Sequence, residues 1–515
     1  MKKIVFISPY CYKSIPVRTF HAITHMHGGV EAHSIFFKDS QDNTHPSVTE
    51  REYSLLFNTI AEIKPELVAI SILAPYAVLA KKISREIRKR LNIPIVVGGK
   101  YPTISTEKAL AFADYACKGE GDLVLPDILE RLKEGKDLRG IKGLWHKEAG
   151  TIVNNGQRRL LEDLDTLPFP SVGEPNMYFI SNNRMLTEDP ELYNPNIWIM
   201  TARGCAYECS YCVNSLLAPM NEGNGKLVRQ RSPENVIAEI EAKRKIYKHP
   251  AAVNFLDEVF GTSFKWTESF TRLYKEKIGL PFFCAMAPTM IKEKNIELLA
   301  DAGLCELNFG IQSGVDSIRN GVMNRPGTNK EMFDKIAILK KHKITPLYDL
   351  IYDNPFEDTA ALRQTIELII SIPHPRKFST FKMQFFEKYP FTEAALRLNH
   401  IRPEDLSDEK IAEAVQENWA YVPKISLFGD KIQLQNAIYL LCRNNYGSAW
   451  IAARLSKKTD YFLGFIACIY AYFAYLRYYQ FQLSLSRFNF ALNLLKSPFR
   501  ERWAVANEYR SWQKP

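Results

Sequence analysis

The sequence predicts an α/β protein with an N-terminal doubly wound parallel sheet, a central partial barrel and a C-terminal helical region. Short apolar runs alternate with amphipathic helical patterns over residues 1–135 and again over 196–400, and such alternation is typical of βα units. The chain has 515 residues, enough for roughly three domains. We place the parts at 1–139, 140–195 (a connector), 196–400 and 401–515.

The N-terminal part begins with an apolar run that predicts a buried strand, and two more such runs follow. The clearest helical pattern spans residues 77–91 and stops before Pro94, as a proline-terminated helix should. The sheet should therefore bind ligands at the carboxyl ends of its strands. The predicted strands are 4–7, 67–71 and 95–97, and the predicted helices are 53–63, 77–91 and 122–134.

In the connector, residues 145–153 predict a hairpin, and the two prolines near residue 169 break any regular element. Six βα-like units then suggest a barrel or partial barrel whose working face lies at the strand carboxyl ends. Its predicted strands are 197–201, 252–256, 282–285, 306–311, 346–351 and 380–385, with helices such as 233–245 and 329–342 between them.

The composition indicates the cellular compartment and the kind of partner to expect. No signal peptide is expected, since the start runs straight into a strand, and no apolar run reaches the ~20 residues of a spanning helix. Nine cysteines are too few for a disulfide scaffold, so we expect a reduced, cytoplasmic chain. The net charge is +10, of which +7 lies in residues 454–515. That basic tail indicates either an anionic surface as partner or a solvated helical face.

Three cysteines spaced C-x3-C-x2-C follow the first predicted barrel strand: Cys205, Cys209 and Cys212. Such a loop can place three thiolates on three irons of a cubane. No fourth cysteine is near, whereas a closed structural zinc site takes four protein ligands. The pattern therefore favours a catalytic cluster with one open iron over a zinc site completed by a distant side chain. The other six cysteines read as buried hydrophobes.

The triplet, with aromatic Tyr211 before its last cysteine, resembles the signature of the radical S-adenosylmethionine superfamily. Residues 255–260 resemble the acidic end of the family's second barrel strand, and residues 310–314 its fourth-strand motif, with Gln312 where glutamate is usual. Residues 353–358 resemble its fifth-strand turn. The resemblance implies a TIM-like (β/α)6 barrel and a 4Fe–4S cluster on Cys205, Cys209 and Cys212. It also implies S-adenosylmethionine near Tyr211, Gln312 and Ser313, cleaved on reduction to a 5′-deoxyadenosyl radical.

Glycine-rich strings at three predicted strand ends resemble the cobalamin-binding domain that precedes many of these barrels. They are Ser71-Ile72-Leu73, Gly98-Gly99-Lys100-Tyr101-Pro102-Thr103 and Gly119-Glu120-Gly121-Asp122. Tyr101 stands where the family has histidine. The resemblance implies a Rossmann-like, flavodoxin-type domain with cobalamin lined by Ser71, Leu73, Gly98, Gly99, Gly119 and Glu120.

No Asp-x-His-x-x-Gly string occurs in the chain. That string supplies a histidine to cobalt in cobalamin domains of the mutase type. The first loop region holds three histidines without that spacing, namely His21, His25 and His27. We therefore expect cobalamin to bind without a histidine from this loop.

These features predict a cobalamin-dependent radical S-adenosylmethionine methyltransferase acting on an unactivated carbon or a phosphinate phosphorus. The alternatives are a radical cyclase, like the anaerobic cyclase of magnesium-protoporphyrin ester, and a non-catalytic cobalamin or cluster sensor. Expected partners are a small-molecule substrate and an electron donor such as flavodoxin or ferredoxin, with no nucleic acid.

The C-terminal region is helical and aromatic, with an uncharged run at residues 461–476. Three interpretations stay open for this run: a buried helix that caps the barrel, an interfacial or lipid-substrate surface with peripheral membrane contact, and a true span.

Overall fold

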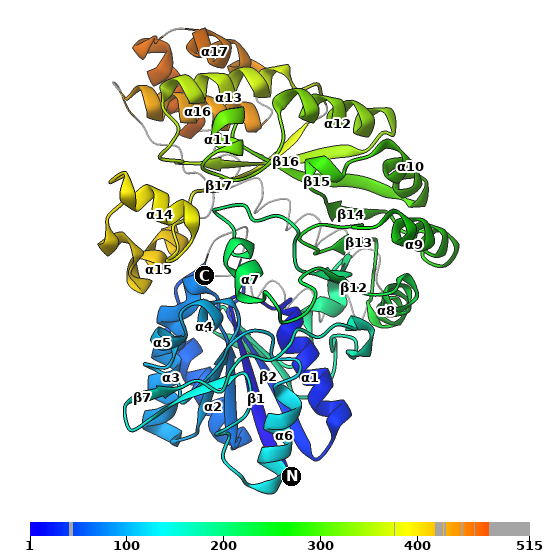
Figure 1. The fold of residues 1–515 in the computed structure, drawn as a ribbon, viewed down its shortest axis with the longest axis vertical. Coiled ribbons are helices and arrows are strands. Elements are labelled where there is room, and N and C mark those ends of the chain that lie inside the picture. Colours follow the sequence, from blue (N-terminus) through cyan, green and yellow to red (C-terminus); the bar gives the residue numbers. More distant parts are fainter. Residues whose placement is uncertain are drawn as a thin grey trace.

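Two sheets, the first mixed and the second parallel, lie one above the other along the long axis of the molecule, with helices around both (Figure 1). The computed structural model describes residues 1–40, 45–374, 376–417, 426, 429–443, 446–457 and 459–472. Most of the basic tail and the end of the 461–476 run lie outside the described residues. The α/β architecture predicted from strand–helix alternation is confirmed for both sheets.

The first sheet has nine strands in the order β7-β6-β5-β4-β3-β1-β2-β8-β9. Its five central strands are parallel, and their order reverses between β1 and β3. This is the flavodoxin-type doubly wound order, in which the reversal point marks the ligand crevice. The central strands are β1 (Lys2–Pro9), β2 (Val30–Phe37), β3 (Leu67–Ser71), β4 (Ile95–Gly98) and β5 (Tyr115–Cys117).

Helices cover both faces of this sheet. Alternate residues of a strand point to opposite sides, and apolar residues on both sides have to be buried. On β1, Val5 and Ile7 pack under two helices, whereas Ile4 and Phe6 pack under two others. The first pair is α2 (Glu50–Ile63) and α3 (Ala77–Leu91), and the second pair is α1 (Ile15–His27) and α6 (Leu125–Glu134). The short helices α4 (Lys100–Ile104) and α5 (Thr106–Ala109) follow β4.

The connector forms more structure than the sequence predicted. Its hairpin is confirmed as β6 (Leu144–Glu148) and β7 (Thr151–Val153), which pair antiparallel. Strands β8 (Met177–Ser181) and β9 (Arg184–Leu186) also join the first sheet, and β8 pairs with β2. The ring of Phe179 stacks on Phe36 at 4.8 Å, so β8 covers an apolar edge. Residues 140–195 thus contribute four strands to the first sheet.

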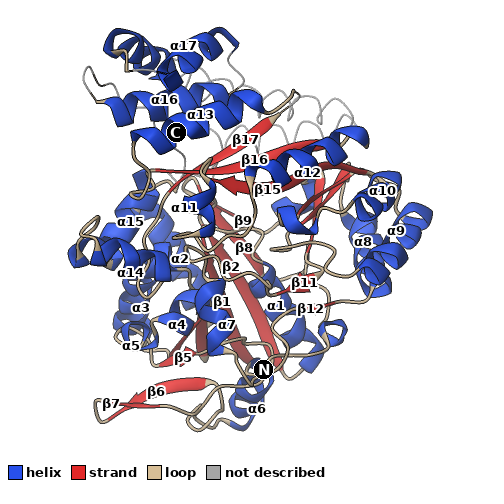
Figure 2. Cartoon of the chain, turned by 45° about the horizontal axis from the view of Figure 1, so that its top comes forward, coloured by secondary structure: helices blue, strands red, loops and turns tan. Residues whose placement is uncertain are grey.

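The second sheet contains six parallel strands in chain order, which is the arrangement of a partial (β/α)6 barrel (Figure 2). The prediction placed the last strand three residues too late, because the apolar run continues past the sheet and packs on α14. The strands are β10 (Asn196–Ile199), β13 (Ala252–Phe255), β14 (Phe282–Ala285), β15 (Leu304–Gln312), β16 (Thr345–Tyr352) and β17 (Lys377–Lys382).

Helices cover the outer face of the second sheet. They are α8 (Pro233–Ile246), α9 (Phe264–Lys277), α10 (Glu293–Ala302), α12 (Asn329–Lys341) and α13 (Thr359–Ser371). The shorter helices α7 (Asn214–Met220) and α11 (Asp316–Asn320) lie near the carboxyl ends of the strands.

Helices are the only regular elements among the described residues of the C-terminal region, as predicted. Helix α14 (Pro390–Arg397) precedes this region, and α15 (Asp408–Glu417), α16 (Asp430–Cys442) and α17 (Tyr446–Lys457) lie within it. Residues 461–472 are also helical, and Ala467 and Ala471 are buried in the core that α16 shares with the barrel helices. Among the described helices, none has the length and apolar character needed to cross a bilayer.

Candidate active site

The cysteine loop leaves the barrel after β10, through a two-residue strand, β11 (Ala202–Arg203). Buried Asp257 fixes this exit, because its carboxylate accepts hydrogen bonds from the backbone of Thr201 and Ala202 at 2.7 and 2.8 Å. Gly204 follows with φ +87°, and a Cβ there would lie 2.1 Å from the carbonyl oxygen of Leu227. Only glycine fits this position, so the backbone geometry dictates how the loop begins.

The cysteine loop is also held by the segment that follows α11 (Asp316–Asn320). The backbone N–H of Ser210 donates to the carbonyl of Met323 at 3.0 Å. The guanidinium of Arg325 lies between the two segments: Nη1 is 3.7 Å from Sγ of Cys209, and Nε donates to the carbonyl of Gly310 at 3.2 Å. A cation is thus positioned beside one thiol of the triplet. The spacing pattern did not reveal Arg325, because it lies more than a hundred residues further along the chain.

The three thiols fit a cluster better than a single ion. Cys205 and Cys209 are buried, Cys212 is half-buried, and none is in a disulfide. Within the described residues, no three Cys, His, Asp or Glu side chains converge on one metal-sized point. Burial above all, with smaller contributions from Glu258 and the other two thiols, raises the pKa of Cys205 to about 11, although a hydrogen bond from the backbone of Tyr207 acts in the opposite direction. Three thiolates here need positive charge to be stable, and three irons of a cubane provide it.

A cavity of about 330 Å³ separates the cysteine loop from the first sheet. Cys212 and Tyr211 line one side, and Leu73, after β3, lines the other with 42% of its side chain exposed. Lys100 lines it too, with Nζ 3.6 Å from Oε1 of Glu258. Most of the other lining side chains are apolar, and no histidine is among them. The full lining is Leu73, Ala74, Pro75, Lys100, Tyr101, Ile104, Ser105, Tyr211, Cys212, Val213, Phe386, Glu387, Tyr389, Asp408 and Ile411.

Helix α15 closes the cavity from the C-terminal side. The hydroxyl of Tyr101 donates to Asp408 at 2.7 Å, so the residue that replaces the family's histidine holds this helix instead. On α1, Nδ1 of His21 lies 2.9 Å from the Ser34 hydroxyl, and burial lowers the pKa of His21 to about 4. His27 pairs with Glu130 at 3.1 Å. Both histidines thus have partners within the first domain.

Of the residues predicted to line cobalamin, Leu73 lines the cavity, and Ser71, Gly98, Gly99, Gly119 and Glu120 are not among its lining residues. Gly99 has φ +108°, and a Cβ there would lie 2.7 Å from the carbonyl oxygen of Ile72. The chain's own backbone therefore requires this glycine. The carboxylate of Glu120 receives two hydrogen bonds from Arg229, at 2.6 and 2.8 Å.

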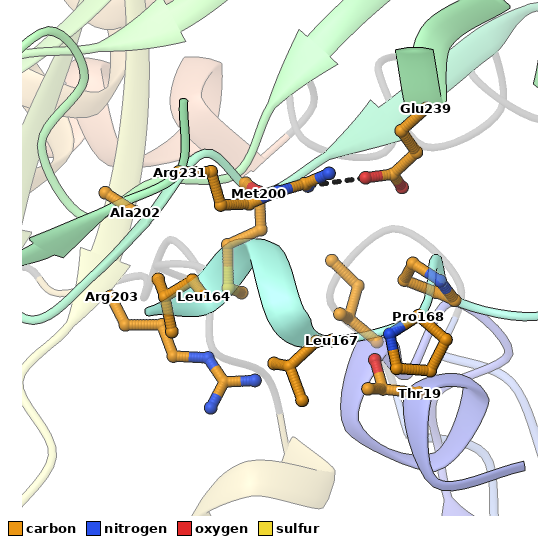
Figure 3. A pocket seen from close by; sticks show the side chains of 11 residues that line it. Thr19, Leu164, Leu167, Pro168, Met200, Ala202, Arg203, Arg231 and Glu239 are labelled. Atoms are coloured by element: carbon orange, nitrogen blue, oxygen red, sulfur yellow. Dashed lines mark hydrogen bonds and ion pairs between the residues drawn. The ribbon is translucent and has the colours of Figure 1, made fainter. Parts of the chain in front are cut away.

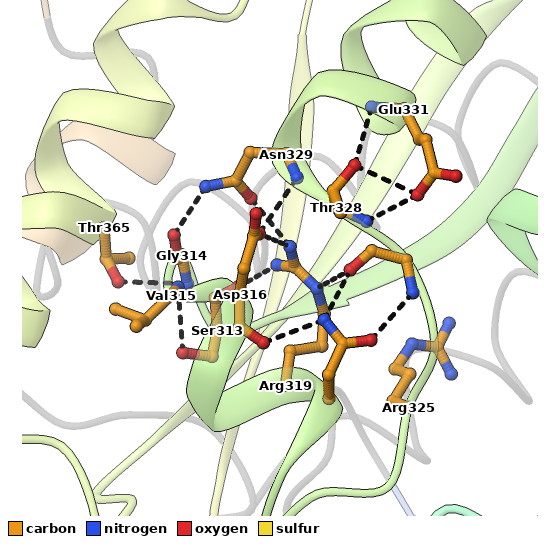
Figure 4. A network of polar contacts seen from close by, with 12 residues as sticks. Ser313, Gly314, Val315, Asp316, Arg319, Arg325, Thr328, Asn329, Glu331 and Thr365 are labelled. Carbon is orange, nitrogen blue, oxygen red and sulfur yellow. Dashed lines mark hydrogen bonds and ion pairs between the residues drawn. The ribbon is translucent and has the colours of Figure 1, made fainter.

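The two residues predicted to contact S-adenosylmethionine at the end of β15, Gln312 and Ser313, lie in different environments. Gln312 ends the strand at a register irregularity, with φ +65°. Ser313 is buried, and its hydroxyl donates to the carboxylate of Glu357. The backbone carbonyl of Ser313 accepts from Arg319 at 2.5 Å. The Ser313 side chain is therefore committed to an internal network (Figure 4).

Arg319 is the centre of that network and holds the segment that carries Arg325. Its side chain is 1% exposed and also donates to Asp316 and to Asn329, in the latter case at 2.8 Å. Arg319→Met should destabilise the protein by about 3 kcal/mol, because buried acceptors lose their donor. Urea denaturation would measure this. Arg319→Lys should recover only part of the loss, since lysine lacks the planar fork. A Met variant as stable as wild type would contradict the network's role.

The buried carboxyl of Glu357 predicts a pH dependence of stability. Burial raises its pKa to about 7, although Ser313 and Lys431 act in the opposite direction. The native state then holds a proton that the unfolded state releases, so stability falls as pH rises from about 4.5 to 7. Glu357→Gln removes this slope. Relative to the variant, wild type should lose at most about 3 kcal/mol between pH 5 and 8 in urea titrations. Parallel profiles would contradict the assignment.

Residues outside the predicted set also face the site. Alternation along the strands places Asn308 and Asp349 on the inner face of the barrel, opposite the side that packs on the helices. Nδ2 of Asn308 donates to Asp349 at 3.3 Å. Burial raises the pKa of Asp349 to about 6, while Asn308 and Arg325 counteract that effect. The sequence carried a signal for Asp349, because it stands between the apolar residues Tyr348 and Leu350 of β16 and must therefore face the other side of the sheet.

A second, smaller cavity of about 40 Å³ lies between α1, residues 164–170 and the end of β10 (Figure 3). Arg231 lines it and is hydrogen-bonded to Glu239. Its volume suits a few water molecules and excludes any of the expected cofactors.

Comparisons with known proteins agree with this geometry. Residues 41–129 match the B12-binding domain family, and residues 199–369 match the radical SAM superfamily. An uncharacterized methyltransferase of Pyrococcus horikoshii is 27% identical over 61% of this chain and 66% of its own length, which is just under two thirds.

Two solved structures share the fold. The radical S-adenosylmethionine methyltransferase TsrM from Kitasatospora setae, solved with cobalamin and a [4Fe-4S] cluster, has a TM-score of 0.60 at 19% identity, over 78% of this chain and 76% of that one. The cobalamin-dependent S-adenosylmethionine radical enzyme OxsB, solved with aqua-cobalamin and S-adenosylmethionine bound, has a TM-score of 0.63 at 14% identity. The match covers 99% of this chain and 75% of OxsB.

A doubly wound sheet and a partial barrel that share one cavity are the architecture of an α/β enzyme that binds its ligands at the carboxyl ends of its strands. By these two family matches, residues 41–129 are a B12-binding domain and residues 199–369 a radical S-adenosylmethionine domain. These two domains imply three cofactors: a 4Fe–4S cluster, S-adenosylmethionine and cobalamin.

Proposed function

We propose that this protein is a cobalamin-dependent radical S-adenosylmethionine methyltransferase that transfers a methyl group to an unactivated carbon or phosphinate phosphorus of a small molecule. One observation carries the proposal: Leu73 and Tyr101 of the first domain and Cys212 of the cysteine loop line the same cavity. A group bound at the end of β3 and one bound at the cysteines would face each other there. The similarity to TsrM and to the Pyrococcus protein, both described as methyltransferases, supports methyl transfer.

In this proposal Cys205, Cys209 and Cys212 hold the cluster, and Tyr211 packs beside it. Arg325 would pair with the carboxylate of S-adenosylmethionine and Glu258 with its ammonium group, since both side chains lie beside the cysteines. Gln312 and Asp349 face the same region from the strand ends. Cobalamin would lie against Leu73 and the strand ends that carry Ser71, Gly98, Gly99 and Gly119.

When bound, the cluster supplies an electron for cleavage of S-adenosylmethionine, and cobalamin supplies the methyl group. The chain's own contribution is orientation and exclusion of water. Apolar side chains such as Ile104, Val213 and Phe386 line most of the cavity, and Asp408 on Tyr101 holds α15 across it. An apolar lining of this kind helps to keep water from reactive intermediates.

The test is to incubate the anaerobically reconstituted, cobalamin-loaded protein with S-adenosylmethionine and a strong reductant. Mass spectrometry then quantifies two products. S-adenosylhomocysteine reports methyl donation, and 5′-deoxyadenosine reports reductive cleavage. We expect both. Deoxyadenosine alone would favour the cyclase alternative, and neither product from fully loaded protein would favour the sensor.

A further inference from the structure

A two-stranded ribbon at the base of the cysteine loop carries two arginines directly opposite each other. Arg203 of β11 pairs with Arg229 of β12 (Arg229–Gln230) in antiparallel register. Like charges at such positions repel, and Arg229 is 4% exposed, so water screens it little. The ribbon alone therefore should not close stably.

The first domain supplies both counter-charges. The carboxylate of Asp122 accepts from the two Nη atoms of Arg203 at 2.7 and 3.1 Å. Glu120 binds Arg229 in the same forked way and also lies 3.8 Å from Arg203. Paired, planar contacts of this kind fix orientation as well as charge. Ribbon closure thus depends on a loop of the other domain.

Each partner of this contact is next to one cofactor site. The ribbon closes the segment 204–228, which contains all three cysteines, and Arg203 directly precedes the Gly204 turn. Glu120 and Asp122 lie in the loop between β5 and α6, one of the three strand-end loops assigned to cobalamin. A change in the position of either loop must therefore alter the contacts among the same four charged side chains.

We propose that Glu120, Asp122, Arg203 and Arg229 are positioning residues that couple cluster binding to cobalamin binding. The inference rests on the proposed placement of the two cofactors. A cluster on the cysteines holds the ribbon closed, which fixes the Glu120–Asp122 loop in its cobalamin-binding position. Because such coupling is reciprocal, bound cobalamin must retain the cluster by the same factor.

The test compares hydroxocobalamin affinity in cluster-loaded protein and in protein freed of iron by mild chelation. Wild type should bind about tenfold more tightly when loaded. The double variant Glu120→Gln, Asp122→Asn should bring this ratio close to one. The reciprocal measurement is the rate of iron loss to a chelator, which cobalamin should slow in wild type and leave unchanged in the variant.

Two further variants separate coupling from general loss of structure. The exchange Asp122→Arg with Arg203→Asp should restore part of the ratio, because the paired charges return in reverse. Glu409→Gln removes a carboxylate near Lys81, at 4.0 Å, in another contact of the first domain, and should leave the ratio at its wild-type value.

Equal affinity of loaded and cluster-free wild type would overturn the inference, as would a double variant that keeps the ratio. A double variant that weakens both affinities equally would also overturn it, since that is a purely structural effect. No methyl acceptor or S-adenosylmethionine is present in these measurements. An intact ratio in a protein that makes no S-adenosylhomocysteine would therefore refute only the proposed methyl transfer.

Discussion

Replacing Cys209 with alanine should abolish 4Fe–4S loading and all cleavage of S-adenosylmethionine. Two thiolates remain in this variant, and they leave one more iron without a protein ligand. The side chain of Arg325 also loses the sulfur that it faces at 3.7 Å. Iron content, the EPR signal after reduction and the yield of 5′-deoxyadenosine would each measure the loss.

The matched control is Cys305→Ala. Cys305 lies on β15, and its thiol donates to the carbonyl of Phe282 at 3.4 Å, so this variant removes a thiol outside the loop. It should load the cluster and cleave S-adenosylmethionine as wild type does. If Cys209→Ala kept a 4Fe–4S spectrum and full turnover, the cluster assignment would be wrong.

Arg325→Gln should weaken binding of S-adenosylmethionine about ten- to a hundredfold while the cluster still loads. A hydrogen bond between charged groups contributes about 1.5–3 kcal/mol, and the variant keeps a donor but loses the charge. Because the lost cation lies beside Cys209, the midpoint potential of the cluster should also become more negative. Equilibrium dialysis with labelled S-adenosylmethionine and an EPR-monitored redox titration would measure the two effects.

Arg272→Gln is the control for this prediction, since Arg272 is an exposed residue of the outer helix α9. It should change neither the affinity nor the potential. An Arg325→Gln protein with wild-type affinity would remove Arg325 from the proposed binding site. A changed affinity with an unchanged potential would show that its charge acts on the ligand and not on the cluster.

The sequence predicted elements whose pattern is local. Strand β3 and helix α3 have exactly the expected bounds, because an uninterrupted apolar run and a 3.6-residue period specify each one. Strand β2 was missed since it carries Glu31, His33 and Ser34 among its apolar residues, and β5 is only three residues long. Partners from α1 and β8 satisfy those polar side chains, and a single segment of sequence does not reveal them.

In the candidate site, too, the sequence revealed what is local and missed what depends on tertiary contacts. The cysteine spacing lies within eight residues and was readable, whereas Arg325 meets Cys209 only through the fold. Glu120 was assigned to cobalamin by its motif, and the structure gives its carboxylate to Arg229, a contact between residues 109 positions apart. Motifs specify which side chains gather at strand ends, and tertiary packing decides which of their atoms remain available.

Strands β7 and β9 have a consequence for how the first domain can be produced alone. Each is three residues long, belongs to a tight hairpin and forms one margin of the sheet. Short margins of this kind offer little backbone for pairing with another molecule. A fragment ending at residue 139 would lack both and would present β2, with Phe36, as a long apolar margin. Such a fragment should aggregate, and one ending at residue 195 should stay monomeric in size-exclusion chromatography.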